Sequence, residues 1–311
     1  MWENLDEMIR SFFIALSTNK SLRRVMEESS VGRALSRRFV AGLTVDEAVA
    51  ASKELNAQGL AVSLDALGEN VHTVEEAQLS AGLYVRLLDA IAADGLNANV
   101  SLKLTQMGID LSEKLAEEIV GGLVERANAI GTFVRIDMEG TPYTQTTVEM
   151  TRRLSARNPG AVGTVLQAYL YRTADDAKRL TAEGIRIRLC KGAYKEAASL
   201  AFQDKTDTDR NYVTVMQQLL ESGVFCGIAT HDEAIVHEAK SFAASKGIDR
   251  QAFEFQMLYG IRRDLQRSLV AEGYRVRIYV PFGPEWYPYF MRRLAERPAN
   301  VVFVLKNLLK R

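Results

Sequence analysis

Residues 132–170 read TFVRIDMEGTPYTQTTVEMTRRLSARNPGAVGTVLQAYL, and this stretch decides the fold. Short runs of β-forming residues stand at its two ends, over 132–139 and 162–170, and a helical segment separates them. A strand, a helix and a second strand in this order are typical of two parallel strands joined by a crossover helix. The stretch therefore predicts one βαβ unit.

The same unit recurs along most of the chain. Between helical segments rich in Ala, Glu, Leu and Arg, β-rich runs occupy residues 60–67, 98–106, 132–139, 162–170, 185–190, 225–231, 253–258 and 276–283. Eight units between residues 60 and 283 predict a closed (β/α)8 barrel. An open, doubly wound sheet is the alternative, and the absence of a GxGxxG motif after any strand disfavours it.

The two ends of the chain add helices to this barrel. Residues 1–58 have helical spacing, and Thr44 followed by Glu47 predicts a capping box. After the last strand, residues 284–311 predict two helices, GPEWYPYFMRRLAERP and VVFVLKNLLK. No Pro/Gly/Ser-rich linker divides the sequence, so we expect one domain over 1–311. The last helix is basic and amphipathic; we expect it to pack on the barrel wall, and contact with a membrane surface is the alternative.

The charge and cysteine content exclude several classes of protein. Lys+Arg and Asp+Glu both number 39, so the basic excess typical of non-specific nucleic-acid binding is absent. The two cysteines, Cys190 and Cys226, form no CxxC pair, which favours a reducing cytoplasm. The acidic N-terminus is unlike a signal peptide, and no run of about 18 apolar residues predicts a membrane-spanning helix. We expect a cytoplasmic protein, with peripheral attachment to the inner face of the cell membrane left open.

Charged residues inside the predicted strands indicate a polar layer within the barrel. Strand residues of a barrel alternate between its interior and its helices, and both surroundings are mostly apolar, so an unpaired charge there is costly. We therefore expect one inward, mutually paired layer, extended by two glutamines: Lys103, Arg135, Asp137, Arg186, Arg188, Gln167 and Gln256. A structural network of ion pairs without chemistry is the alternative. Several of these residues stand in the later half of their strands, however, which is where barrel active sites form.

The sequence lacks the motifs of several common enzymes. None of its three histidines stands in an HxH or HExxH motif, so no metal site is predicted, and no GxSxG motif marks a serine hydrolase. Lys103 or Lys191 could form a Schiff base, as in barrel aldolases. The excess positive charge of the cluster is better suited to holding an anion. The residues alone thus predict an enzyme that binds an anionic small molecule, while a lyase using either lysine and a non-catalytic anion-binding barrel stay open.

Seven motifs resemble, in their order along the chain, those of proline dehydrogenase. They are SLKLTQMGIDLSE, RIDMEGTPYT, VLQAYLYRT, IRLCKGAYKE, ATHDE, FEFQMLYG and RIYVPFGPEWYPYFMRRLAERPAN. The match spans about residues 30–305 and resembles the short, stand-alone bacterial type. This family oxidises L-proline to Δ1-pyrroline-5-carboxylate, the first step of proline degradation to glutamate. The resemblance implies FAD as the cofactor on a distorted (β/α)8 barrel, with an extra C-terminal helix that carries the substrate-binding arginines.

The resemblance also implies residues for the flavin. Arg188 would lie beside flavin N5 and stabilise negative charge as the ring accepts a hydride from proline C5. Asp137 would orient the cationic cluster near the substrate. The cofactor would be lined by Met138, Gln167, Arg188, Lys191, Gly192, Ala193, Thr230, His231 and Gln256.

For the substrate, the resemblance implies a cationic clamp and a gate. The substrate-binding set would be Lys103, Tyr279, Tyr289, Arg292 and Arg293. Its three cations would bind the proline carboxylate, because guanidinium groups offer bidentate geometry to it. Tyr279 would pack against the proline ring, and Glu69 would pair with Arg292 to gate the site when substrate binds. A membrane quinone would reoxidise the reduced cofactor, and a separate pyrroline-5-carboxylate dehydrogenase would use the product.

Overall fold

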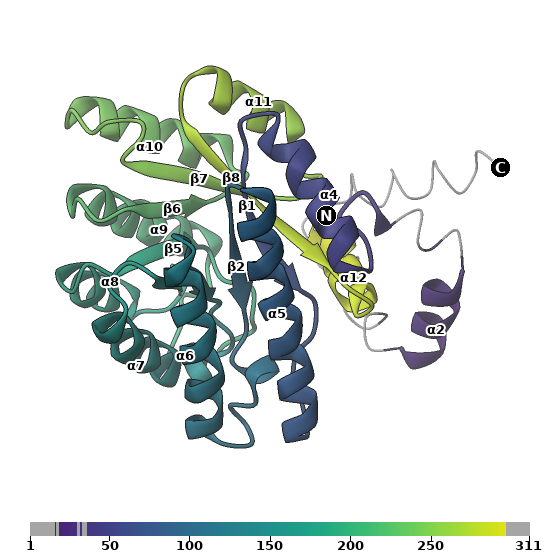
Figure 1. The fold of residues 1–311 in the computed structure, drawn as a ribbon. Helices are drawn as coiled ribbons and strands as arrows, with labels where there is room; N and C mark the ends of the chain where they lie inside the picture. The colour runs from purple at the N-terminus through teal and green to yellow at the C-terminus, as the bar shows by residue number, and fades with distance from the viewer. Residues whose placement is uncertain (1–15, 17–18, 30–31, 33–35, 297–311) are drawn as a thin grey trace.

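The structure, a computed structural model, describes residues 16, 19–29, 32 and 36–296 of the 311-residue chain. Eight parallel strands close into a barrel in the order of the sequence, and the last strand pairs with the first (Figure 1). The strands are β1 (Ala61–Ala66), β2 (Ala98–Leu102), β3 (Val134–Ile136), β4 (Val162–Gln167), β5 (Arg186–Cys190), β6 (Cys226–Ala229), β7 (Phe253–Leu258) and β8 (Arg275–Phe282). The predicted (β/α)8 barrel is therefore confirmed.

A helix follows each of the first seven strands and covers the outside of the barrel (Figure 1). These helices are α5 (Val74–Asp94), α6 (Glu113–Ala129), α7 (Thr141–Arg157), α8 (Thr173–Ala182), α9 (Lys205–Glu221), α10 (Glu233–Ser245) and α11 (Arg263–Ala271). Helix α5 is representative, because Tyr84, Leu87, Leu88 and Ile91 recur at helical spacing and are buried. The apolar faces of such helices and the outer faces of the strands form one continuous core.

Several predicted strands extend beyond the observed ones at their carboxyl ends. The run 98–106 ends as a strand at Leu102, and Thr105–Met107 forms the short 3-10 helix η1. The amide of Thr105 donates to Glu139 Oε2 at 3.1 Å, so a side chain satisfies it in place of a neighbouring strand. β-Forming residues in these segments thus build the loops at the carboxyl end of the barrel, where sequence periodicity alone cannot distinguish them from strand.

Helix α4 (Val45–Asn56) packs against both β1 and β8. It begins at the predicted capping box, in which Thr44 Oγ1 accepts from the amide of Glu47 and Glu47 Oε2 accepts from the amide of Thr44, each at 3.2 Å. In a regular barrel the helix that follows the eighth strand lies on the outer ring. Here α4 occupies the place on the outer ring beside β8 and β1, so the helix after β8 does not lie on that ring.

That last helix, α12 (Trp286–Glu296), lies at the carboxyl end of the barrel beside α2 (Lys20–Glu28) (Figure 1). A second apolar cluster holds it there: Phe39, Val40, Leu67, Ile261, Trp286, Tyr287, Tyr289, Phe290, Met291 and Leu294. Leu67 follows β1 and Ile261 follows β7, which fixes the end of the barrel that α12 covers. The second predicted C-terminal helix, VVFVLKNLLK over 301–310, lies outside the described residues.

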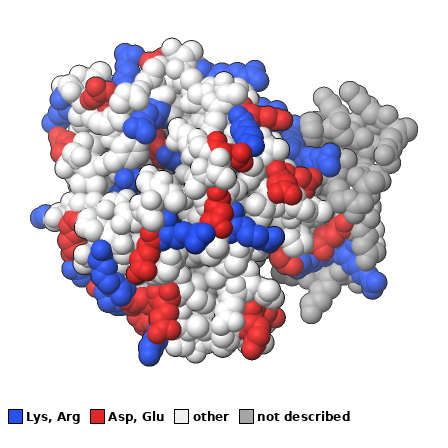
Figure 2. Space-filling view, viewed as in Figure 1, with Lys and Arg blue, Asp and Glu red and all other residues white. Residues whose placement is uncertain are grey.

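Acidic and basic side chains are interspersed over the face shown in Figure 2, in keeping with the zero net charge of the chain. Among the residues that the structure describes, no helix combines the length and the hydropathy needed to cross a membrane.

Candidate active site

A polar network fills the barrel near the carboxyl ends of its strands, and Asp137 lies at its centre. Asp137 Oδ1 accepts from Arg188 Nη1 at 2.9 Å and from Ser101 Oγ at 2.7 Å. Its Oδ2 accepts from the hydroxyl of Tyr279 at 2.8 Å. Residues of three strands, β2, β5 and β8, therefore converge on one carboxylate, which directly follows β3.

Arg188 is the second hub of this network and is almost fully buried. Besides its ion pair with Asp137, its Nε donates to Gln256 Oε1 and its Nη2 donates to Ser63 Oγ at 3.2 Å. Its guanidinium carbon lies 5.1 Å from the centroid of the Tyr279 ring. Buried guanidinium groups need such fixed partners, because an unpaired charge in the interior is strongly destabilising.

Lys103, which is largely buried, and the fully buried Asp65 form an ion pair beside these residues, with 3.5 Å between Lys103 Nζ and Asp65 Oδ1. Burial alone would lower the pKa of Lys103, but the carboxylates of Asp65 and Asp137 outweigh it, and the pKa is raised. The amine is therefore protonated at neutral pH. A protonated amine can hold an anion but cannot attack a carbonyl, which disfavours a Schiff base at this lysine.

The expected single layer of mutually paired charges is wrong, because the interior has two tiers. The upper tier consists of Ser63, Asp65, Ser101, Lys103, Asp137, Arg188, Gln256 and Tyr279, and the lower tier of Arg135, Arg186, Glu254 and Arg277. Arg135 and Arg186 precede Asp137 and Arg188 by two residues, which is about 7 Å along a strand. Arg135 Nη1 donates to the carbonyls of Thr164 and Arg186, each at 2.9 Å, rather than to a carboxylate.

From the sequence we did not identify several of the oppositely charged and hydrogen-bonding side chains that allow the charges of these two tiers to be buried. Glu254 and Arg277 form an ion pair with 2.7 Å between Oε1 and Nε, and their side chains are 0% and 6% exposed. Asp65, Ser63 and Ser101 were missed in the upper tier. The same alternation that indicated Lys103 also applies to β1, β7 and β8, so the signal was present in the sequence.

The loop after β5 carries three of the residues predicted to line the cofactor. Lys191 Nζ lies 2.5 Å from Asp209 Oδ1 and 3.2 Å from Asp232 Oδ2. Gly192 has φ +114°, and a Cβ there would fall 2.4 Å from the Tyr169 ring. Only glycine suits both this conformation and this contact. Ala193 follows it and is exposed.

The same loop is fastened to the neighbouring helix. Glu196 accepts from the amide of Thr141 at 2.8 Å and from its hydroxyl, at the first residue of α7. The N-cap residue of α7 is Gly140, which has no side chain to cap the helix, so Glu196 supplies the missing acceptor from outside.

The other residues predicted for the cofactor lie on or directly after β3, β4, β6 and β7. Gln167 donates to the carbonyl of Glu139 at 2.9 Å. Met138, the residue before Glu139, is buried. Thr230 Oγ1 accepts from the amide of Asp232 at 3.0 Å. His231 Nε2 accepts from the amide of Leu258 at 3.0 Å. These strand-end residues and Gln256 of the upper tier therefore share the carboxyl end of the barrel with the residues after β5.

Helix α12 brings the predicted substrate arginines to the same end. Arg292 Nη1 lies 3.8 Å from Glu69 Oε1, which belongs to the loop after β1, and each side chain is 40% exposed. The guanidinium carbon of Arg293 lies 5.0 Å from the centroid of the Tyr289 ring, and Tyr289 is buried. One ion pair thus connects the loop after β1 to α12.

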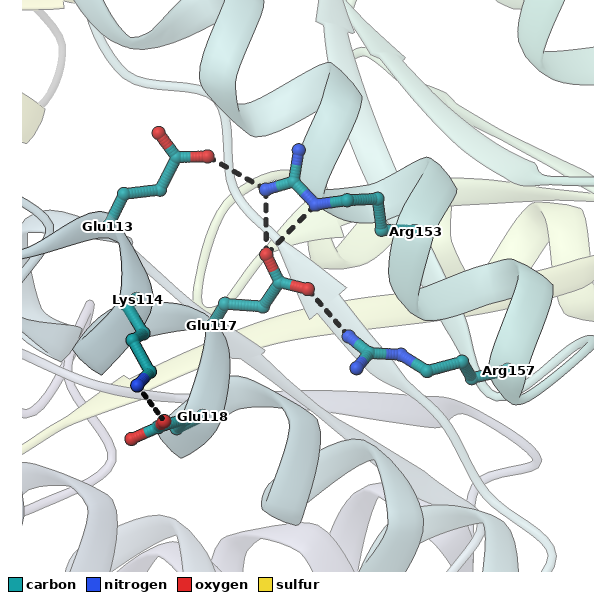
Figure 3. Close-up of a pocket in the computed structure, with 6 residues that line it drawn as sticks. All are labelled: Glu113, Lys114, Glu117, Glu118, Arg153 and Arg157. Atoms are coloured by element: carbon teal, nitrogen blue, oxygen red, sulfur yellow. Dashed lines mark hydrogen bonds and ion pairs between the residues drawn. The ribbon is translucent and has the colours of Figure 1, made fainter.

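A hollow on the outer surface between α6 and α7 is unrelated to this site (Figure 3). It is lined by Glu113, Lys114, Glu117, Glu118, Arg153 and Arg157. Arg153 contacts Glu113 and Glu117, each at 2.7 Å, and Arg157 contacts Glu117 at 2.6 Å. Its acidic and basic groups are matched in number, and all but the partly buried Glu117 are exposed, so they form a solvated ion-pair network.

Comparisons with known proteins agree on one family. The family model of proline dehydrogenase matches residues 48–306. Proline dehydrogenase 1 of Bacillus subtilis (strain 168) is 43% identical over 304 residues, which cover 98% of this chain and 100% of that protein. Proline dehydrogenase of Deinococcus radiodurans is 39% identical over 310 residues, covering 98% and 99%. Among solved structures, proline utilization A (PutA) from Bdellovibrio bacteriovorus, inactivated by N-propargylglycine, has a TM-score of 0.81 and 26% identity over 93% of this chain and 36% of that one.

Proposed function

This chain belongs to the proline dehydrogenase family and oxidises proline, and we propose that it does so with FAD as cofactor and a quinone as the final electron acceptor. The product would be Δ1-pyrroline-5-carboxylate. The observation that carries the proposal is the convergence of buried cationic and hydrogen-bonding side chains, Lys103, Arg188 and Gln256, at the carboxyl end of the barrel. Active sites of (β/α)8 enzymes form at that end.

The donor set of this site fits a flavin dinucleotide. A reduced flavin and a pyrophosphate both carry negative charge, and the barrel mouth offers Arg188 and Lys191 as cations. Gly192 carries no side chain at the turn after β5, and the Tyr169 ring packs where its Cβ would be. We propose that the cofactor is held by Met138, Gln167, Arg188, Lys191, Gly192, Ala193, Thr230, His231 and Gln256.

When bound, FAD supplies the acceptor for the hydride that leaves proline C5. Arg188 would stabilise the negative charge that develops on the acceptor, because its guanidinium is already fixed and needs no reorganisation. Asp137 would hold that guanidinium in place. The proline carboxylate would be bound by Lys103, Arg292 and Arg293, which fixes the orientation of the substrate ring against the cofactor.

Two aromatic residues and one acid would complete the substrate site. Tyr279 would pack against the proline ring, and Tyr289 would support Arg293, whose guanidinium lies over its ring. Glu69 would gate the site through its ion pair with Arg292. Because both members of this pair are partly exposed, the pair can open and close at small energetic cost.

The electron acceptor and the next enzyme follow from the same proposal. A membrane quinone would reoxidise the cofactor, and a separate pyrroline-5-carboxylate dehydrogenase would use the product. We expect a cytoplasmic protein that reaches the quinone by peripheral contact with the membrane. Liposome flotation with and without residues 298–311 tests whether that basic segment makes the contact; unchanged flotation after truncation would reject the membrane contact of this segment.

An absorption spectrum tests the proposed function directly. The purified protein should show a flavin band that bleaches when L-proline is added without oxygen. A band that ignores proline would reject the substrate assignment. A colourless protein that FAD cannot reconstitute would reject the cofactor, and borohydride trapping at Lys191 would then test the lyase alternative.

A further inference from the structure

A continuous chain of hydrogen bonds leads from the lower tier of the barrel to Arg188. Glu254, on β7, is fully buried, and its Oε1 accepts from Arg277 Nε at 2.7 Å and from Gln256 Nε2 at 2.6 Å. Gln256 Oε1 in turn accepts from Arg188 Nε. The side-chain amide of Gln256 is therefore the link between the two tiers.

The side-chain amide of Gln256 has an NH2 group that donates and an oxygen that accepts, and here each of them faces a partner that can bond with it alone. The NH2 end faces a carboxylate, which only accepts, and the oxygen faces a guanidinium N–H, which only donates. Rotating the amide by half a turn would set acceptor against acceptor and donor against donor. In a buried site both mismatches are costly, so Glu254 selects one orientation of Gln256.

The position of Gln256 also depends on a glycine of the neighbouring strand. A Cβ added to Gly227 on β6 would lie 2.3 Å from Gln256 Nε2. The barrel wall leaves this space open, and the amide occupies it. The three atoms nearest to such a Cβ all belong to Gln256, so an alanine at 227 would displace the amide first.

Arg277 keeps the acceptor charged. It donates to Glu254, to the carbonyl of Val62 at 2.8 Å and to Asn99 Oδ1 at 3.1 Å, so it is fixed on three sides. Burial alone would raise the pKa of Glu254, but the charge of Arg277 outweighs it, and the pKa is lowered. Glu254 is therefore a carboxylate at neutral pH.

We propose that Glu254 is a positioning residue of the active site, which orients the amide of Gln256 so that its oxygen fixes the guanidinium of Arg188. Arg277 and Gly227 support this role by holding the carboxylate and by leaving room for the amide. The effect of this positioning on the reaction rate rests on the proposed function, in which Arg188 lies beside the cofactor. The positioning itself is a property of the protein chain alone.

Three variants test the role in different ways. E254Q keeps an oxygen that can accept both hydrogen bonds; it also removes the counter-charge of Arg277, which we expect to lower the stability of the fold rather than to reorient Gln256. The double variant E254M/R277M removes the acceptor together with its counter-charge, since removing one partner would leave a buried charge unpaired. G227A displaces the amide and leaves the ion pair intact. D176N is the matched control, because Asp176 is a buried carboxylate on α8 that pairs with Arg172, outside the barrel interior.

Crystal structures of the full chain with and without FAD should show the Arg188 Nε–Gln256 Oε1 bond in the wild type, D176N and E254Q, and its loss in the other two variants. In the FAD-loaded protein we expect the loss to slow flavin reduction by proline about tenfold and to make the flavin midpoint potential more negative, with KM for proline little changed. E254Q should restore the rate to within about threefold of the wild type.

An intact Arg188–Gln256 bond in E254M/R277M, or a wild-type flavin potential in G227A, would overturn the proposal. If the double variant does not fold, G227A still tests the step from Gln256 to Arg188, because it displaces the amide and keeps the buried ion pair; an intact Arg188–Gln256 bond in G227A would overturn that step. If the wild type binds no FAD, the proposed function fails, and the structures without FAD still decide whether Glu254 orients Gln256.

Discussion

Arg188 is the residue through which most of the upper tier is connected, since three of its nitrogens donate to Gln256, Asp137 and Ser63. A lysine keeps the charge but has one nitrogen and no planar fork. We therefore expect R188K to slow flavin reduction by proline about 10- to 100-fold in stopped-flow absorbance. R186K, one tier lower on the same strand, is the control and should stay within about threefold. Equal losses in both variants would contradict a special role for Arg188.

The pH dependence of the reaction should show whether the titrating group is the amine of proline or the side chain of Lys103. The raised pKa of Lys103 means that this amine is protonated throughout the range from about pH 6 to 9 and does not titrate there. Proline must lose its amine proton before an imine can form, so kcat/KM should rise with pH over this range. K103R should lower the rate but keep the shape of the profile. A profile that flattens in K103R would assign the titration to the lysine.

At the scale of elements, the strands could be predicted but their ends could not. Each predicted run overlaps an observed strand, because β-forming residues bounded by turns give a local signal. The carboxyl end of β2 at Leu102 depends on a side chain from another segment, because Glu139 in the loop after β3 accepts from the amide of Thr105. The same reason explains why Lys103 and Asp137 were found as charges within strands although they lie just beyond them.

The loop after β5 is the element most sensitive to a single methyl group. Gly192 combines φ +114° with the close approach to the Tyr169 ring, so G192A should shift the loop that carries Lys191 and Ala193. We expect about tenfold weaker FAD binding by fluorescence titration. G184A is the control, because Gly184 also has positive φ, but a Cβ there meets nothing within 4 Å. Unchanged FAD affinity in G192A would remove this loop from the cofactor site.

The connection between the loop after β1 and α12 should affect substrate binding only modestly. Glu69 and Arg292 are each 40% exposed, and such pairs contribute about 0–1 kcal/mol. E69A should therefore change KM for proline by no more than about fivefold. E285A is a matched control, because Glu285 pairs with Arg23 at 2.5 Å next to α12 but outside the site. Identical kcat and KM in E69A and the wild type would leave the gate unsupported.

At the scale of the whole molecule, the described residues contain a large barrel core and a separate apolar cluster around α12. The barrel followed from a repeated local pattern. The place of α12 did not, because it depends on contacts such as Phe39 with Phe290, whose ring centroids lie 6.1 Å apart although the residues are far apart in sequence. In the lower tier, Arg135 and Arg186 were predicted and Glu254 and Arg277 were not; the alternation of their strands indicates both as inward charges, but their pairing depends on the register of β7 with β8.

These two cores predict that α12 can open without unfolding the barrel. Phe290 is buried in the second cluster, and truncating a buried phenylalanine costs about 3–5 kcal/mol. F290A should therefore speed amide hydrogen exchange in α12 by about 100-fold or more while the strands keep their protection. F255A, in the barrel core, should instead speed exchange across the strands. Because α12 carries Arg292 and Arg293, F290A should also raise KM for proline. Equal acceleration of α12 and the strands in F290A would show that the chain unfolds as one cooperative unit.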